Sequence, residues 1–136
     1  MPPTPLSFLY IDDDPMSRSI LKIMLETLLG AEQVLILANS ENFTKLIQNL
    51  PFVPTLILLD IQVRPYNGYE MLAMLRADPR YAGTRIVALT ANVMASDVEK
   101  MKAAGFDGLI GKPFNHRVFL GLMKSILAGE TIWYIS

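Results

Sequence analysis

Five short apolar runs, each followed by a segment of helical periodicity, constrain the fold of this chain more than any other feature. The runs cover residues 7–11, 34–38, 56–59, 86–89 and 108–111. They are apolar throughout instead of alternating with polar residues, which is typical of strands covered on both faces. Strands that alternate with helices favour a parallel sheet. The sequence therefore predicts an α/β fold, with a five-stranded parallel sheet and helices on both faces.

The chain length of 136 residues suits a single domain. We expect an N-terminal lead-in at 1–6, one domain over 7–128 and an apolar C-terminal tail at 129–136. The lead-in contains three prolines, and the tail contains the only tryptophan. The tail is expected to pack on its own domain. The alternative is a contact with a partner or with a second copy, because Trp and Tyr are favoured at interfaces.

Charge and hydropathy argue against several classes of function. With 12 basic and 13 acidic residues the net charge is −1, and no cluster of Lys and Arg marks a nucleic-acid surface. No apolar run reaches the length of a membrane span, and the N-terminus lacks the regions of a signal peptide. The chain has no cysteine, which excludes disulfide and thiolate chemistry. We expect a cytoplasmic protein that binds neither nucleic acid nor membrane.

Polar residues follow four of the five predicted strands. They are Asp12 and Asp13 after the first, Asp60 after the third, Thr90 after the fourth and Lys112 after the fifth. Parallel strands end at the same edge of a sheet, so these side chains should converge in the crevice where such folds bind ligands. A single Asp after a strand is usually a turn residue or a helix cap. The combination, not any one residue, predicts a site.

The chemistry of this combination suits phosphoryl transfer. Three neighbouring carboxylates repel one another, and a divalent cation removes that conflict. Carboxylate oxygens suit Mg²⁺, which also accepts a phosphate oxygen, so we predict a Mg²⁺ site at Asp12, Asp13 and Asp60. Asp60 would attack phosphorus and form an aspartyl phosphate. Thr90 would donate a hydrogen bond to the phosphoryl group, and Lys112 would neutralise its charge.

The chain resembles the receiver domain of two-component response regulators, in a stand-alone form similar to the chemotaxis regulators. The resemblance spans about residues 7–128. The matching stretches are FLYIDDDP at 8–15, PTLILLDIQ at 54–62, NGYEML at 67–72, IVALTANVMASD at 86–97 and AAGFDGLIGKPF at 103–114.

This resemblance implies a flavodoxin-like (βα)5 fold and the roles given above for the strand-end residues. It adds the backbone carbonyl of Gln62 as a further ligand of Mg²⁺. The phosphodonor would be a histidine kinase or a histidine phosphotransfer protein. The chain would not be an enzyme beyond Mg²⁺-dependent self-phosphorylation and dephosphorylation. Its output would pass through protein–protein contact. A homodimer would use either the tail or the face formed by residues 97–104, 108–111 and 115–128.

Some positions depart from the family pattern. The third and fourth residues after Asp60 are usually Met-Pro, but here they are Val63 and Arg64. Leu109 stands where the family usually has the aromatic partner of the switch threonine. The two residues that flank the site in the family are neutral amides here, namely Gln62 and Asn92.

Two alternatives stay open from the sequence. One is a pseudo-receiver, a binding module that does not take phosphate. The other is a receiver fragment cut from a larger hybrid kinase. A small phosphotransferase or phosphatase ranks lower, because Ile61 and Gln62 supply no second carboxylate beside Asp60. A flavin-binding module also ranks lower, because no phosphate-cradling loop follows the first strand.

Overall fold

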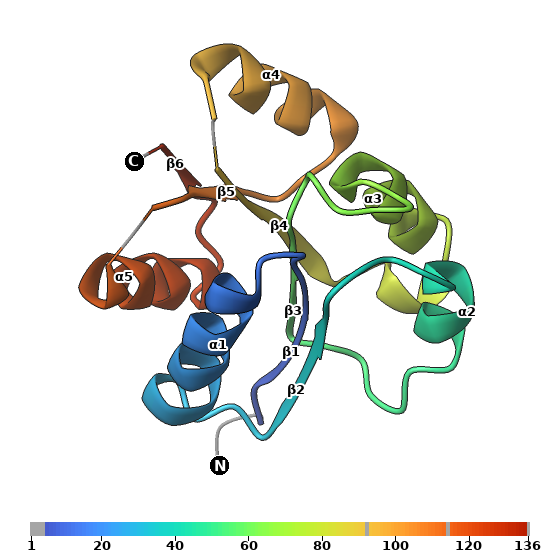
Figure 1. Ribbon diagram of the computed structural model, residues 1–136, viewed down its shortest axis with the longest axis horizontal. Helices are drawn as coiled ribbons and strands as arrows, with labels where there is room; N and C mark the ends of the chain where they lie inside the picture. The colour runs from blue at the N-terminus through green and yellow to red at the C-terminus, as the bar shows by residue number, and fades with distance from the viewer. Residues whose placement is uncertain (1–4, 92, 114, 136) are drawn as a thin grey trace.

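The computed structural model, which describes residues 5–91, 93–113 and 115–135, contains one parallel sheet of six strands (Figure 1). The strand order is β2-β1-β3-β4-β5-β6. The strand bounds are β1 (Ser7–Ile11), β2 (Gln33–Leu37), β3 (Leu56–Leu59), β4 (Arg85–Thr90), β5 (Leu109–Gly111) and β6 (Trp133–Tyr134). The first five lie within one residue of the predicted runs. The order reverses between β1 and β3, which is where such sheets open a crevice at their C-terminal edge.

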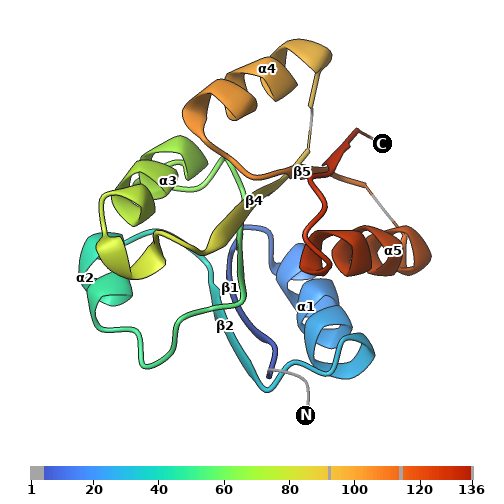
Figure 2. The same cartoon turned by 180° about the vertical axis from the view of Figure 1, so that it is seen from behind.

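Helices cover both faces of the sheet, which confirms the predicted fold class (Figures 1 and 2). One face carries α1 (Pro15–Ile23), its π-helical continuation η1 (Met24–Leu28) and α5 (His116–Leu127). The other carries α2 (Phe43–Gln48), α3 (Gly68–Arg76), the short 3₁₀ turn η2 (Pro79–Tyr81) and α4 (Ala95–Ala104). Within the described ranges, none of these helices has the length and apolarity needed to cross a membrane. Residues 1–4 of the lead-in, Asn92, Phe114 and Ser136 lie outside the described residues.

Each strand contributes to two separate cores because successive side chains point to opposite faces. In β1, Leu9 and Ile11 pack on the side of α2, α3 and α4, whereas Phe8 and Tyr10 pack on the side of α1 and α5. All four are fully buried. Burial of such a side chain stabilises the fold by about 1.5–3 kcal/mol. This double burial explains why the runs are apolar without alternation.

The helices that follow three strand ends begin at capped residues, which fixes the loops between them. Asp14 accepts a hydrogen bond from the N–H of Met16 at 3.1 Å. Asn67 accepts from the N–H of Glu70, whose carboxylate accepts in turn from the N–H of Asn67. Asn115 accepts from the N–H of Val118 at 2.8 Å. Each cap is worth about 1 kcal/mol, so the loops at the C-terminal edge of the sheet are anchored at their helical ends.

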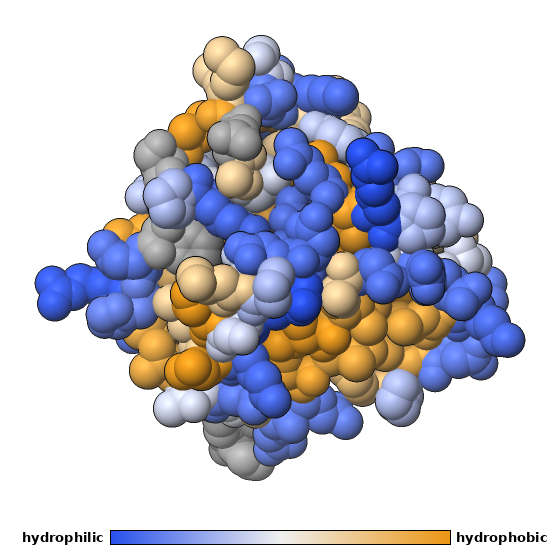
Figure 3. All heavy atoms as spheres, in the orientation of Figure 1, coloured by the Kyte–Doolittle hydropathy of each residue, from blue (hydrophilic) through white to orange (hydrophobic). Residues whose placement is uncertain are grey.

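At one edge of the sheet, β2 is only partly covered. Its residues 34–37 are half-buried, and apolar surface gathers between β2 and α2 (Figure 3). Leu35, Leu46 and Leu50 line a shallow hollow there. This edge lacks a further strand in the described chain, in contrast to the opposite edge.

The C-terminal tail forms that opposite edge, which corrects the prediction of five strands. Leu109 of β5 pairs with Trp133 and Ile110 pairs with Tyr134. The N–H of Leu109 donates to the carbonyl of Ile132 at 2.8 Å. Gly108 permits this approach, since a Cβ there would lie 2.8 Å from the same carbonyl oxygen. The tail is thus an integral strand.

Side chains on both faces of the sheet hold the tail in place. The guanidinium of Arg85 donates to the carbonyls of Ile126 and Glu130 at 2.7 and 2.8 Å. The ammonium of Lys102 in α4 lies 5.3 Å from the centre of the Trp133 ring, a cation–π contact. Trp133 packs on the α4 side of the sheet.

We predict that Gly108→Ala lowers the free energy of unfolding by about 1–3 kcal/mol, because the new Cβ displaces the tail. Urea denaturation followed by circular dichroism measures the change. The matched control is Gly121→Ala in α5, where an added Cβ meets nothing within 4 Å. This control should be neutral or stabilising by about 0.5–1 kcal/mol. In a chain truncated after Gly129 the Gly108→Ala penalty should vanish, and a penalty that persists would contradict the pairing.

Candidate functional site

The sheet's backbone ladder brings four strand ends to one edge. Ile11 lies opposite Leu59, and the N–H of Asp60 donates to the carbonyl of Ile11 at 3.0 Å. Thr90 lies opposite Gly111, and the N–H of Lys112 donates to the carbonyl of Thr90 at 2.8 Å. The ladder therefore fixes where each functional side chain leaves the backbone, as the strand-end pattern predicts.

Asp12 is the most enclosed member of the cluster, with no exposed surface. Its Oδ2 accepts hydrogen bonds from the ammonium of Lys112 at 2.5 Å and from the hydroxyl of Tyr10. Its Oδ1 accepts from the N–H of Asp14 at 2.9 Å, and Arg18 donates to its backbone carbonyl. A carboxylate with three donors is held in one orientation. Burial raises the pKa of Tyr10, and the adjacent Asp12 raises it further, so this hydroxyl stays a donor.

Asp60 is also buried but is less firmly paired. Its Oδ1 accepts from the N–H of Gln62 at 3.1 Å, and its Oδ2 accepts from Lys112 at 3.4 Å. Burial raises the pKa of the Asp60 carboxyl, and the negative charge of Asp12 adds to that shift; the N–H of Gln62 and the charge of Lys112 oppose it. For Lys112, burial alone would lower the pKa. The hydrogen bond to Asp12 and the charge of Asp60 outweigh burial, so the pKa is raised and the ammonium stays charged.

The three predicted carboxylates come together. One oxygen each from Asp12, Asp13 and Asp60 lie within 4.8 Å of one another. Asp13 is exposed, so the cluster faces solvent on one side. Three carboxylates against the single ammonium of Lys112 leave a negative excess, which a divalent cation would offset. The all-oxygen donor set fits Mg²⁺, which keeps several of its waters when bound. That these residues bind Mg²⁺ stays a prediction.

Of the two other predicted residues, Gln62 contacts the cluster through its N–H, whereas the hydroxyl of Thr90 contacts a neighbouring backbone carbonyl. Thr90 is buried, and its hydroxyl makes a weak 3.5 Å contact with the carbonyl of Ala91. Such a contact is readily exchanged for a better acceptor. The N–H of Gln62 binds Asp60, whereas the role predicted for its carbonyl stays a prediction. Asn92 is outside the described residues.

The loop after Asp60 is held in a fixed shape despite its unusual sequence. Val63 is 2% exposed and packs in the core on the α2–α4 side. The hydroxyl of Ser40, buried after β2, accepts from the N–H of Tyr66 and donates to its carbonyl, both at 2.7 Å. The N–H of Ser40 donates to the carbonyl of Arg64 at 3.0 Å. Apolar Val63 therefore serves as an anchor for the loop.

Sequence reasoning missed two residues that shape the site, Tyr10 and Ser40. Tyr10 stands two positions before Asp12, so both point to one face of the strand and its continuation. The two-residue spacing between Tyr10 and Asp12 in the sequence could therefore have indicated their contact. Ser40 carried no such signal, because its partner Tyr66 is 26 residues away. Leu109, at the usual aromatic position, is fully buried in the core.

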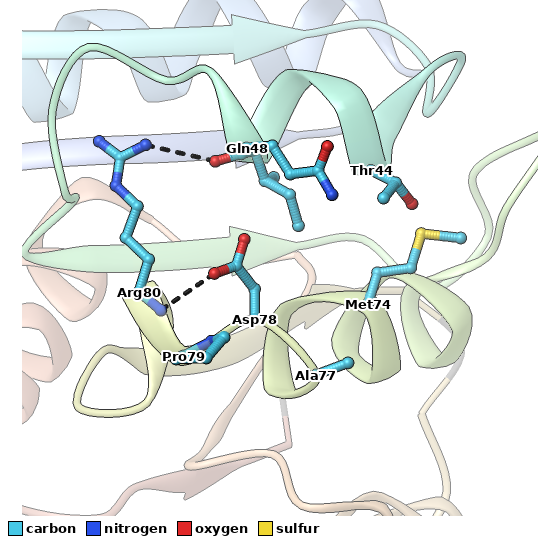
Figure 4. A pocket seen from close by; sticks show the side chains of 8 residues that line it. Thr44, Gln48, Met74, Ala77, Asp78, Pro79 and Arg80 are labelled. Atoms are coloured by element: carbon cyan, nitrogen blue, oxygen red, sulfur yellow. Dashed lines mark hydrogen bonds between the residues drawn. The ribbon is translucent and has the colours of Figure 1, made fainter.

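A second hollow lies away from the cluster, between α2, α3 and η2 (Figure 4). It has a volume of about 560 Å³. Its charged groups are engaged in structure: the guanidinium of Arg80 donates to the carbonyl of Ile47, and Asp78 accepts from the N–H of Arg80. Its lining includes none of the strand-end residues, so it belongs to the packing of these helices and not to the candidate chemistry.

These features define a small doubly wound α/β domain with an oxygen-rich acidic site at its topological switch point. The chain belongs to the response regulator receiver domain family, which it matches over residues 8–124. It is 31% identical over 126 residues to response regulator Rre1 of Synechocystis sp., covering 93% of this chain and 53% of that protein. The chain spans about half the length of the curated relatives it matches first.

Two solved structures share the fold. The chemotaxis response regulator CheY4 of Vibrio cholerae has a TM-score of 0.79 at 23% identity, covering 90% of this chain and 99% of that one. The receiver domain of the sensor histidine kinase PA1611 of Pseudomonas aeruginosa has a TM-score of 0.78 at 23% identity, covering 93% and 100%. The latter was solved with a magnesium ion in its active site cleft. The predicted family and flavodoxin-like architecture are confirmed.

We predict that Asp60→Asn stabilises the metal-free protein at pH 7.5 by about 1 kcal/mol, the order of the cost of burying a poorly paired polar group. Because the folded pKa of Asp60 is raised, the unfolded chain releases this proton first. The wild-type protein therefore loses stability as pH rises from below the unfolded pKa through the folded one. The gain from Asp60→Asn should accordingly disappear in acid.

Urea denaturation in EDTA at pH 7.5 and at pH 4 tests this. Asp78→Asn is the control, because that carboxylate accepts from the N–H of Arg80 in a turn away from the cluster. An Asp60→Asn variant less stable than wild type at pH 7.5 would show that the cluster carries no net repulsion.

Proposed function

We propose that the chain is a phosphoacceptor whose Asp60 takes a phosphoryl group, in a Mg²⁺-dependent reaction, from a histidine kinase or a histidine phosphotransfer protein. The cluster at the strand ends carries this proposal. It combines a buried carboxylate at Asp60, two further carboxylates at Asp12 and Asp13, and the ammonium of Lys112 between Asp12 and Asp60. Membership of the receiver family supports it, as does the magnesium ion in the PA1611 receiver domain.

Asp12, Asp13 and Asp60, with the backbone carbonyl of Gln62, would hold the Mg²⁺. When bound, the ion supplies positive charge that offsets these carboxylates and the phosphoryl oxygens. A carboxylate oxygen of Asp60 attacks phosphorus. The oxygen–phosphorus bond forms as the phosphorus–nitrogen bond to the donor histidine breaks, and the nitrogen keeps the bonding electrons.

Lys112 and Thr90 would bind the oxygens of the transferred phosphoryl group. Lys112 binds Asp12 at 2.5 Å but Asp60 at 3.4 Å, so its ammonium can turn to a phosphoryl oxygen while keeping its shorter hydrogen bond. Thr90 has only a weak local acceptor and can donate to a second oxygen. A phosphoryl group adds about −1.5 to −2 charges. The hydrogen bonds that Lys112 and Thr90 donate would therefore become stronger as the group is transferred.

In this proposal the chain acts on no separate substrate; its chemistry is limited to Mg²⁺-dependent self-phosphorylation and dephosphorylation. It works in the cytoplasm and signals by protein–protein contact, without binding nucleic acid itself. Leu109 is fully buried, so the readout uses other residues of the α4, β5 and α5 face. A homodimer through this face or through the tail belongs to the same proposal.

A receiver fragment of a larger hybrid kinase is the second candidate. It is favoured by the match to the histidine-protein kinase BarA of Escherichia coli, of which the chain covers 13%, and by the likeness to the receiver of a sensor histidine kinase. The chemistry at Asp60 is the same in both readings. A pseudo-receiver is disfavoured because the acidic cluster and Lys112 are both present.

We predict that wild-type protein incubated with Mg²⁺ and acetyl phosphate gains one phosphoryl group by intact-mass spectrometry. Asp60→Asn should gain none, and EDTA should abolish the gain. Lys112→Ala should slow the reaction by about 100-fold, the usual cost of losing one transition-state donor. Asp78→Asn should react like wild type.

Phosphate on the Asp60→Asn variant would place the acceptor elsewhere. A wild-type protein that takes phosphate from neither a small donor nor a histidine kinase would support the pseudo-receiver.

A further inference from the structure

A groove of about 640 Å³ opens beside the acidic cluster, between the loop after β3 and helix α4. Asp13 and Gln62 line it, so it adjoins the proposed phosphoryl site. Arg64 from the loop and Lys100 from α4 line it as well. The groove is larger than a phosphoryl group needs, so its remainder is available to the rest of a ligand.

The backbone of Arg64 is held at the edge of this groove. Its carbonyl accepts from the N–H of Ser40 at 3.0 Å, and the next bonds along the loop fix Tyr66 to the Ser40 hydroxyl. Val63, one residue earlier, is buried in the core. The guanidinium therefore extends from a fixed point instead of from a loose loop.

Lys100 is positioned from the other element. Its ammonium lies 4.7 Å from the centre of the Tyr69 ring. Tyr69 in turn packs edge-to-face on Phe106, with ring centres 5.7 Å apart. This stack limits where the ammonium lies without neutralising its charge.

The charges of the groove favour an anion. Neither Arg64 nor Lys100 forms a salt bridge with any carboxylate in the described parts of the chain. Of the two acidic residues that line the groove, Glu70 caps the N–H of Asn67, and Asp13 belongs to the proposed Mg²⁺ site. With Mg²⁺ bound at Asp13, the groove would present the cations of Arg64 and Lys100 and one carboxylate, Glu70, which is already hydrogen-bonded.

We propose that this groove is an anion subsite for the leaving group of a small acyl phosphate, with Arg64 and Lys100 as the residues that determine donor specificity. The inference rests on the proposed function of Asp60. In the transfer, the Asp60 oxygen–phosphorus bond forms and the phosphorus–oxygen bond to the acyl group breaks. The carboxylate departs with both electrons, so no proton is required. Its negative charge grows in the loose transition state, where the two cations stabilise it.

Two phosphodonors whose leaving groups differ in charge test this assignment. Acetyl phosphate releases a carboxylate, whereas phosphoramidate carries a protonated amine and releases ammonia. Arg64→Ala and Lys100→Ala should each lower the acetyl phosphate to phosphoramidate rate ratio by about threefold, as expected for one partly exposed ion pair. The double variant should lower it by about tenfold. Arg117→Ala and Lys124→Ala remove the same charges from exposed positions on α5 and should leave the ratio unchanged.

An unchanged ratio in the double variant overturns the subsite, as does an equal change in the α5 controls. Equal slowing with both donors also overturns it, since that indicates general damage to the site. If wild type takes phosphate from neither small donor, transfer from a histidine kinase decides the proposed function, and ligand binding decides the subsite separately.

For binding, we would titrate Mg²⁺-loaded protein with phosphonoacetate and with methylphosphonate, following the backbone amides of Gln62 and Tyr69 by NMR. Wild type should bind phosphonoacetate, which carries an additional carboxylate, about threefold more tightly or better. The double variant should bind the two alike. Equal affinities in wild type would overturn the anion subsite whether or not transfer occurs.

Discussion

The ammonium of Lys112 lies between Asp12 and Asp60, two carboxylates that would otherwise repel each other inside the protein. The contact joins β5 to β1 and β3 across the C-terminal edge of the sheet. It does not balance the charge, because one ammonium faces two carboxylates and Asp13 adds a third nearby. An arrangement that concentrates negative charge in this way is costly without a divalent cation, and that cost is the physical basis of the Mg²⁺ site we propose. The rest of the fold serves to hold it there.

The sheet can hold such a site because its stability comes from elsewhere. Strands β1, β3, β4 and β5 are buried on both faces, with alternate side chains packing against α1 and α5 or against α2, α3 and α4. Polar residues are thereby confined to the strand ends, where the backbone ladder positions them. Capped helix starts at Asp14, Asn67 and Asn115 then anchor the loops that surround them. The apolar residues within a strand stabilise the fold, and the polar residues at its C-terminal end form the candidate site.

The features particular to this chain surround the shared cluster. The loop after Asp60 is fixed by the hydrogen bonds of Ser40 and by the burial of Val63. Arg64, between these anchors, is an exposed cation next to the site. On the far side, β6 extends the sheet along β5, so the residue opposite Leu109 is Trp133. Family membership alone describes neither feature. They are where donor specificity and readout would differ from those of other receivers.

The sequence by itself determined the five principal strands and the positions of Asp12, Asp13, Asp60, Thr90 and Lys112. These depend on local patterns, namely the apolar runs and the residue that follows each one, and parallel strands must end together. Tertiary structure alone decided that residues 133–134 form a strand and that Ser40 binds Tyr66. A two-residue strand has no periodicity to detect, and a hydrogen bond across 26 residues exists only once the chain has folded. Local burial patterns specify the sheet, whereas contacts between distant segments specify how its edge is completed.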